Sequence, residues 1–272
     1  MQGTRHNESS TLPLAAAFIG LPLALALAWQ IRHLQIGLRR GLQMARHASV
    51  DECRPASPAA RVLFLGDSTG VGVGAGRPEA PLPGLLGAAF PDVQITNRCR
   101  NGARVGDVLK HISSAQGTAA NFDLALLLVG GNDVLRFTSL SKLAQQSEEL
   151  LDGTAKTAKQ TVWLGSANIG SSPRLIWPLN ELLSQRTQRV MHLLSTLARR
   201  RGVDFIDFFR PREADFFARR ADVFFADDGL HPSAASYQHS VDSLLQSSPP
   251  HDLLLTGQGT VRWHRQQMLQ TH

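Results

Sequence analysis

The chain has 272 residues, enough for one globular domain of ordinary size with an appended segment. Its apolar fraction of 43% is typical of a globular protein, and its net charge is +6. Basic residues are not interleaved with aromatic ones, as they are in proteins that bind single-stranded nucleic acid, so we expect no nucleic-acid partner. The two cysteines, Cys53 and Cys99, lack the spacing of metal ligands, and we expect no metal.

Residues 1–47 are expected to associate with a membrane. Leu12–Trp29 carries no charge and has about the minimum length of a membrane span. Ile31–Met44 has apolar residues near a helical period with arginines between them, which predicts a basic amphipathic helix at an interface. Two alternatives stay open for Leu12–Trp29: a cleaved signal, because Ala26-Leu27-Ala28 has the small-x-small form, and a segment that lies on a surface or packs on the domain. Ile31–Met44 can also be a helix packed on the domain.

The side of the membrane is contested within the sequence. Arg32, Arg39, Arg40 and Arg46 follow the apolar stretch, which by the positive-inside rule keeps the next domain on the cytoplasmic side. A cleaved signal would instead make the protein secreted or periplasmic.

From Arg61 onwards, strand-like and helical patterns alternate. The strand-like runs are Val62–Leu65, Val93–Thr96, Leu124–Val129, Val162–Gly165 and Val203–Ile206. The helical stretches are Leu82–Phe90, Val105–Ser114, Leu140–Lys159, Leu179–Arg201 and Ser233–Gln246. Continuous apolar strands separated by helices predict a parallel sheet covered on both faces. We therefore predict an α/β fold, a three-layer α/β/α flavodoxin-like domain of about five parallel strands at 61–248, plus an N-terminal apolar helix. A linker at 48–60 precedes the domain, and a tail at 249–272 follows it.

Ser68 is the candidate nucleophile. Gly66-Asp67-Ser68-Thr69-Gly70 follows the first strand of the domain and fits G-x-S-x-G, the pattern of a nucleophile elbow. The position places a hydroxyl at the carboxyl edge of the sheet, where open α/β folds have their sites. The same serine can also be a turn residue or the rim of a phosphate-binding loop.

Asp228 and His231 are the candidate acid and base. They stand three residues apart near the end of the domain, with Gly229 between them and Pro232 directly after. A tight turn would let the carboxylate hold His231 Nδ1 and leave Nε2 free to take the proton of Ser68.

Asn132 and Gly102 are the candidate oxyanion donors. Asn132 follows the apolar run Leu124–Val129, so its amide is expected in the same crevice as Ser68. Gly102 follows the second strand, where its backbone N–H can approach the same point without a side chain in the way. The alternatives are an asparagine cap and an ordinary turn glycine.

Together these motifs resemble those of the SGNH hydrolases, the GDSL lipase/esterase family. Gly66-Asp67-Ser68 matches the nucleophile motif, Asn97 and Gly102 the Asn-x4-Gly segment, Gly130-Gly131-Asn132-Asp133 the Gly-x-Asn-Asp motif, and Asp228-Gly229-Leu230-His231 the Asp-x-x-His motif. Order and spacing agree across Arg61–Leu245, about two thirds of the chain. Thr69 departs from the leucine common in the namesake motif. The resemblance implies that Gly102 supplies an oxyanion N–H, and says nothing of topology in a membrane.

Two rival site classes fit less well. In ordinary α/β-hydrolases the elbow follows several strands, and the acid and the histidine lie in separate loops. A dinucleotide site would use Gly70-Val71-Gly72-Val73-Gly74-Ala75, but the second strand ends in Asn97-Arg98 without the acidic ribose ligand.

The sequence therefore predicts a serine esterase or lipase-like hydrolase without a cofactor, acting on a small-molecule or lipid ester. Alternatives are a carbohydrate O-acetylesterase or acyltransferase on the same fold and a non-catalytic, membrane-tethered binding module. Phe216, Phe217, Phe224 and Phe225 precede His231 and are expected to line an acyl pocket or to belong to the core.

Overall fold

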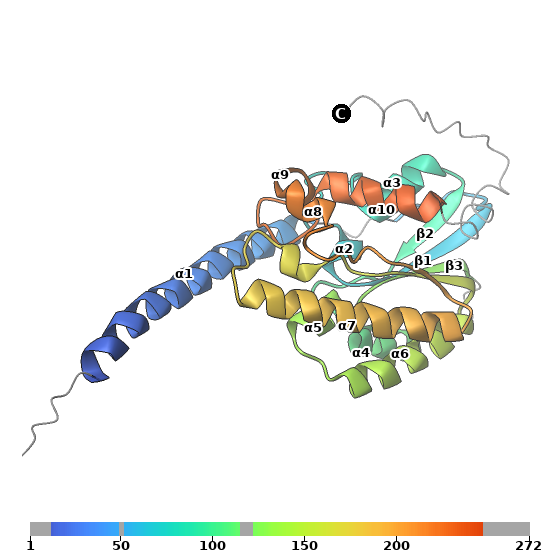
Figure 1. The fold of residues 1–272 in the computed structure, drawn as a ribbon. Coiled ribbons are helices and arrows are strands. Elements are labelled where there is room, and N and C mark those ends of the chain that lie inside the picture. Colours follow the sequence, from blue (N-terminus) through green and yellow to red (C-terminus); the bar gives the residue numbers. More distant parts are fainter. Residues whose placement is uncertain (1–11, 49–51, 115–121, 247–272) are drawn as a thin grey trace, which may run out of the picture.

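The computed structural model describes residues 12–48, 52–114 and 122–246, except for the side chains of residues 12–24. Within them a five-stranded parallel sheet lies between two layers of helices (Figure 1). The strands are β1 (Ala60–Gly66), β2 (Val93–Asn97), β3 (Phe122–Leu128), β4 (Ala158–Leu164) and β5 (Asp204–Ile206). They lie in the order β2-β1-β3-β4-β5, which is the flavodoxin-like order predicted from the sequence.

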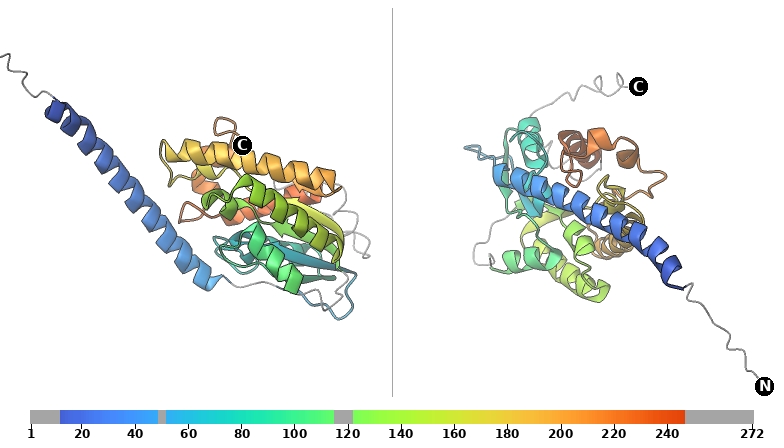
Figure 2. Two further views of the ribbon diagram at one scale, coloured as in Figure 1. Left: turned by 90° about the horizontal axis from the view of Figure 1, so that it is seen from below. Right: turned by 90° about the vertical axis from the view of Figure 1, so that its left-hand side faces the viewer.

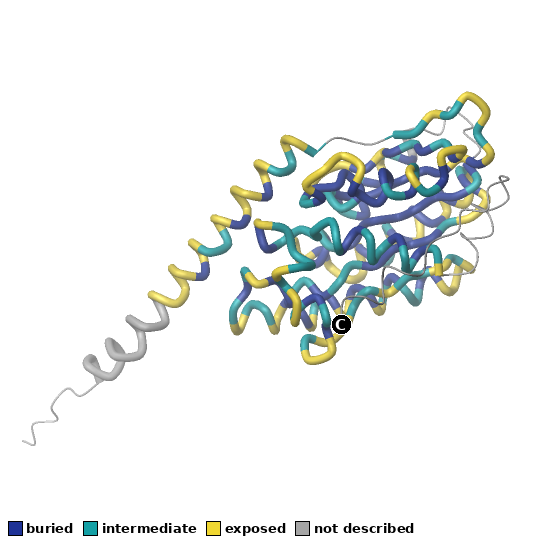
Figure 3. Tube along the Cα trace, turned by 90° about the horizontal axis from the view of Figure 1, so that it is seen from above, coloured by how far each residue is buried: buried dark blue, intermediate teal, exposed yellow. Residues whose placement is uncertain are grey.

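The strands are buried on both faces because successive side chains point to opposite sides. In β1, Val62 and Phe64 belong to one apolar core, whereas Leu63 and Leu65 belong to the other. The first core is covered by α3 (Leu82–Ala89) and α10 (Ala234–Gln246). The second is covered by α4 (Val105–Ser114), α6 (Leu140–Ala155) and α7 (Leu179–Arg200). Figure 3 shows the buried strands between these more exposed helices.

Short helical turns follow several strands and loops. They are α2 (Ser68–Val71), α5 (Gly131–Leu135), the 3-10 turn η1 (Ile169–Ser171), α8 (Phe216–Arg219) and α9 (Ala221–Phe224). The helix predicted over Leu140–Lys159 is wrong at its end, since α6 stops at Ala155 and β4 begins at Ala158. Ala158 pairs with Phe122 of β3, so sheet pairing overrides the helical preference of this segment.

The N-terminal segment is one continuous helix, α1 (Leu12–His47), and not two separate pieces. Its outer part extends away from the domain, as Figure 1 and the left view of Figure 2 show. Across residues 12–48, 52–114 and 122–246, no helix combines the length and the apolar character needed to cross a bilayer. The span expected over Leu12–Trp29 is therefore without support, and the side chains of residues 12–24 lie outside the described ones.

The inner part of α1 packs on the domain. Gln30 is buried, its amide nitrogen donates to the carbonyl of Arg174 at 2.8 Å, and its amide oxygen accepts from the N–H of Ile176 at 2.8 Å. Further along the helix, Met44 and Ala45 contact the core beneath α3 and α10. These contacts support the second interpretation of Ile31–Met44, a helix packed on the domain.

Candidate active site

Ser68 lies at the carboxyl end of β1, between β2 and β3. Strand β1 ends at Gly66, where an added Cβ would lie 2.2 Å from the carbonyl oxygen of Leu128, so only glycine fits at this point of the sheet. Asp67 then caps α2, accepting the N–H of Thr69 on Oδ1 at 2.9 Å. As the first residue of α2, Ser68 has a backbone N–H without a partner inside the helix.

The structure brings Ser68, His231 and Asp228 together although 163 residues separate the first two. Ser68 Oγ lies 3.2 Å from His231 Nε2, and His231 Nδ1 lies 2.5 Å from Asp228 Oδ2. The second oxygen, Asp228 Oδ1, accepts the N–H groups of Leu230 at 2.9 Å and of His231 at 3.0 Å. The carboxylate thus fixes both the ring and the backbone of His231, with Nε2 directed at the serine.

Asp228 is fully buried, and its surroundings favour the carboxylate form. Burial alone raises the pKa of Asp228, but the hydrogen bonds from the His231 side chain and from the N–H groups of His231 and Leu230 outweigh it and hold this pKa below its usual value. Asp67, which precedes Ser68 in the chain, differs from Asp228. Complete burial raises the pKa of Asp67, although hydrogen bonds from Thr69 and Asn132 act to lower it.

The lowered pKa of Asp228 predicts a pH-dependent contribution to stability. A carboxyl whose pKa falls on folding stabilises the protein fully above its unfolded pKa of about 4, and loses this contribution as the pH falls through the lower folded pKa. We expect Asp228→Asn to be less stable than the wild type at pH 7, with a gap that narrows below about pH 4. Urea unfolding of both proteins between pH 7 and the lowest pH at which both fold checks this. A gap that stays constant with pH would contradict it.

The glycine-rich stretch after Ser68 makes room for the histidine loop. At Gly74, which has a φ of +94°, an added Cβ would lie 2.3 Å from the carbonyl oxygen of Pro232 and 3.2 Å from His231 Cβ. The space that a dinucleotide phosphate would need above this glycine is therefore filled by the His231–Pro232 segment, which argues against the phosphate-loop interpretation.

Asn132 contacts the chain neighbours of Ser68 and of Gly102. The amide nitrogen of Asn132 is 3.2 Å from Asp67 Oδ2 and 3.1 Å from the carbonyl oxygen of Ala103, so it joins the turns that carry Ser68 and Gly102. Both amide hydrogens thus face protein acceptors, and an incoming oxyanion would have to share or replace one of them. Asn97 has a structural part: its buried amide donates to the Gly70 carbonyl at 2.8 Å.

The outer side of the histidine loop is held by residues that the sequence did not reveal. Arg40 of α1 donates to the Asp227 carbonyl at 3.0 Å. Arg174 donates through Nε to the Asp228 carbonyl at 2.7 Å and through Nη2 to the Asp227 carbonyl at 3.1 Å. On α1, a Cβ added at Gly41 would lie 2.8 Å from Asp228 Oδ2. The sequence feature that could have indicated this close approach of α1 is the pair Gly37 and Gly41, two glycines one turn apart inside a helical pattern.

The phenylalanines before His231 pack on one another. The rings of Phe216, Phe217 and Phe224 have their centroids 4.2–5.1 Å apart. Phe216 and Phe217 also contact the ring of His239 on α10. These ring contacts favour a packing role for Phe216, Phe217 and Phe224 over an acyl pocket.

A serine, a histidine and an aspartate joined in this order at the carboxyl edge of a flavodoxin-like sheet have the geometry of a serine hydrolase site. The model of the GDSL-like lipase/acylhydrolase family matches residues 64–239. Because this match spans more than half of the chain, the protein belongs to that family and is a carboxylic ester hydrolase. Comparison with curated proteins gives no match.

Solved structures share the fold. A member of the lipolytic G-D-S-L family from Veillonella parvula has a TM-score of 0.55 at 18% identity, over 69% of this chain and 97% of the other. LAE5, an alpha/beta hydrolase from the metagenome of Lake Arreo, has a TM-score of 0.54 at 20% identity, over 70% and 94%. The acetylxylan esterase Axe2 from Geobacillus stearothermophilus has a TM-score of 0.52 at 19% identity, over 71% and 95%. At these identities the likeness shows the fold alone.

Proposed function

We propose that the protein cleaves carboxylic esters through an acyl-enzyme on Ser68. His231 Nε2 takes the proton of Ser68 Oγ as that oxygen attacks the ester carbonyl, and it then gives the proton to the leaving alcohol. A water molecule then gives a proton to His231 and attacks the acyl group, and that proton passes to Ser68 Oγ as the acid leaves and the free serine is restored. Asp228 holds the ring in the required tautomer and stabilises its charged form.

The N–H groups of Ser68 and Gly102 and the Asn132 amide are the proposed oxyanion donors. Ser68 N–H has no acceptor within α2, and Asn132 lies between the two turns concerned. A donor of this kind contributes about 10²–10³ in rate. A carbonyl oxygen turned toward these groups presents its carbon to Ser68 Oγ.

The observation that carries this proposal is the unbroken chain of contacts from Asp228 Oδ2 through His231 to Ser68 Oγ, at 2.5 and 3.2 Å. Both lengths fall within hydrogen-bond reach of a nucleophile and its base. A carboxylate buried against the imidazole and a serine on a helix start are the parts that a serine nucleophile needs.

Covalent labelling with a fluorophosphonate tests the nucleophile. We expect about one adduct per chain in the wild type, located on Ser68, and none in Ser68→Ala, because only a serine activated by its base attacks the phosphorus. Turnover of p-nitrophenyl acetate and butyrate should be lost in the same variant. Equal labelling or turnover of the two proteins would overturn the assignment, and labelling of neither would favour a non-catalytic binding module.

Four activities on esters are compatible with this mechanism. They are those of a short-chain esterase, a lysophospholipase-like esterase, a carbohydrate O-acetylesterase and an acyltransferase. Axe2 shares the fold and is an acetylxylan esterase, which makes acetylated sugars one arm of the test. A series of p-nitrophenyl esters of increasing acyl length separates a short-chain esterase from a lysophospholipase-like one, since an optimum at acetyl argues against a lipid ester. Product analysis with an added alcohol acceptor detects acyl transfer.

A further inference from the structure

A cavity with a cationic wall lies next to the proposed oxyanion site. Its volume is about 520 Å³, and it is bordered by Gly66, two residues before Ser68, and by Gly102. The cationic side chains at its edge are Arg98, Arg100, Lys110 and Arg136. None of these four cationic side chains takes part in the proposed bond cleavage.

Arg136 ties the cavity to the reaction site. A Cβ added at Gly102 would lie 3.2 Å from Arg136 Nη2, so the guanidinium lies directly against the glycine whose N–H is a proposed oxyanion donor. A substrate whose carbonyl oxygen reaches that N–H would therefore place its neighbouring atoms within reach of this arginine.

The cations of this wall outnumber the carboxylates beside them, Glu52 and Asp107, and the charge of Lys110 also lowers the pKa of Asp107. Arg98 pairs with Glu52 at 3.0 Å, and Asp107, the acidic residue at the edge, pairs with Arg104. In the parts of the chain that the structure describes, no ion pair involves Arg100, Lys110 or Arg136, and all three are exposed. The pKa of His111, also at the edge, is lowered by burial and further by the charges of Arg100 and Arg98.

We propose that this cavity binds a phosphate group carried by the alcohol part of the ester. A charged lining disfavours an apolar acyl chain, which leaves the alcohol part as its occupant. Three unpaired cations suit a dianionic phosphate better than a single carboxylate, and the planar guanidinium matches phosphate oxygens in pairs. The inference rests on the proposed function and narrows it to phosphorylated esters.

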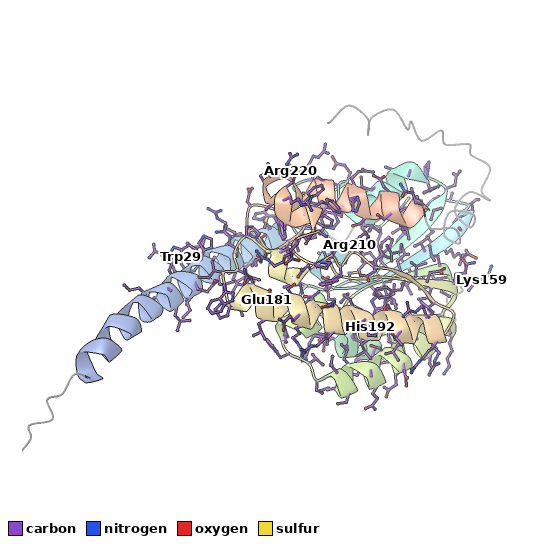
Figure 4. All side chains as sticks on the ribbon, in the orientation of Figure 1. Trp29, Lys159, Glu181, His192, Arg210 and Arg220 are labelled. Carbon is purple, nitrogen blue, oxygen red and sulfur yellow. The ribbon has the colours of Figure 1, made fainter. Side chains whose placement is uncertain are left out.

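A matched pair of substrates tests the proposal: 1-butyrylglycerol and 1-butyrylglycerol 3-phosphate. We expect kcat/KM to be about tenfold higher for the phosphorylated ester at low salt, an advantage that falls as salt screens the charges. Arg100→Gln and Arg136→Gln should each lower this ratio about threefold, and the double variant should bring it close to one. Lys159→Gln is the charge-matched control. Lys159 lies at the amino end of β4, away from the site (Figure 4), so this variant should keep the wild-type ratio.

Equal kcat/KM for both esters, or a ratio that persists in the Arg100→Gln/Arg136→Gln double variant, would overturn the cavity's role while leaving the esterase intact. If neither these esters nor p-nitrophenyl butyrate is cleaved, the proposed function fails, and calorimetry with glycerol 3-phosphate on the Ser68→Ala protein tests the cavity alone. We then expect binding that the double variant loses. Inorganic phosphate binding as tightly as glycerol 3-phosphate would overturn the assignment to the alcohol part.

Discussion

Replacing Asp228 by asparagine is expected to lower kcat by about 10⁴ with little change in KM. Asp228 Oδ2 accepts the proton of His231 Nδ1, which leaves Nε2 unprotonated and facing Ser68 Oγ at 3.2 Å. An asparagine can present its N–H₂ to Nδ1 instead, which moves the ring proton to Nε2 and removes the base. In a serine triad, this wrong tautomer costs about 10⁴ in kcat. Steady-state kinetics on p-nitrophenyl butyrate measures the loss.

The matched control is Asp227→Asn, one residue earlier in the same loop. The Asp227 side chain is exposed, and the carbonyl of the residue accepts from Arg40 and Arg174. We expect this variant to keep kcat within about twofold of the wild type. Asp228 is fully buried and acts through His231, so an unchanged KM in Asp228→Asn would indicate that the substrate site is still folded. A loss of less than tenfold in Asp228→Asn would remove the carboxylate from the mechanism.

The sheet and the meeting of the motifs were predictable because local patterns encode them. The continuous apolar run in β1 requires burial on both faces, and parallel strands bring their carboxyl ends to one edge. Asp67, which precedes Ser68 after β1, therefore contacts Asn132, which follows β3, for a reason that the order of elements contains.

Contacts between distant segments were not predictable in this way. The pattern of Ile31–Met44 gives a helix with two glycines, but nothing local says which surface those glycines approach. The same holds for Arg174, whose two hydrogen bonds to the histidine loop depend on the path of the chain after β4. The sequence likewise left the phenylalanines before His231 open between an acyl pocket and the core, because the ring contacts with His239 arise only from the packing of α10.

A methyl group at position 41 is expected to impair catalysis from outside the crevice. A Cβ added at Gly41 would lie 2.8 Å from Asp228 Oδ2, 3.3 Å from His231 Cε1 and 3.4 Å from His231 Nδ1. The first separation is too short for ordinary contact, so either α1 or the carboxylate must move. Since Gln30 and Arg40 before Gly41 and Met44 after it hold α1 on the domain, we expect the carboxylate and with it the imidazole to shift.

We therefore expect Gly41→Ala to lower kcat about 10-fold to 100-fold, the cost of misplacing a reacting group by up to about 1 Å, with KM nearly unchanged. The rate of fluorophosphonate labelling should fall in parallel, because it needs the same base. Gln43→Ala, on an exposed position of the same helix, is the control and should keep both rates. Alanine favours a helix over glycine by about 0.5–1 kcal/mol, so a weakened α1 would not explain the loss. A Gly41→Ala protein with wild-type kcat would show that α1 packs beside Asp228 without bearing on its position.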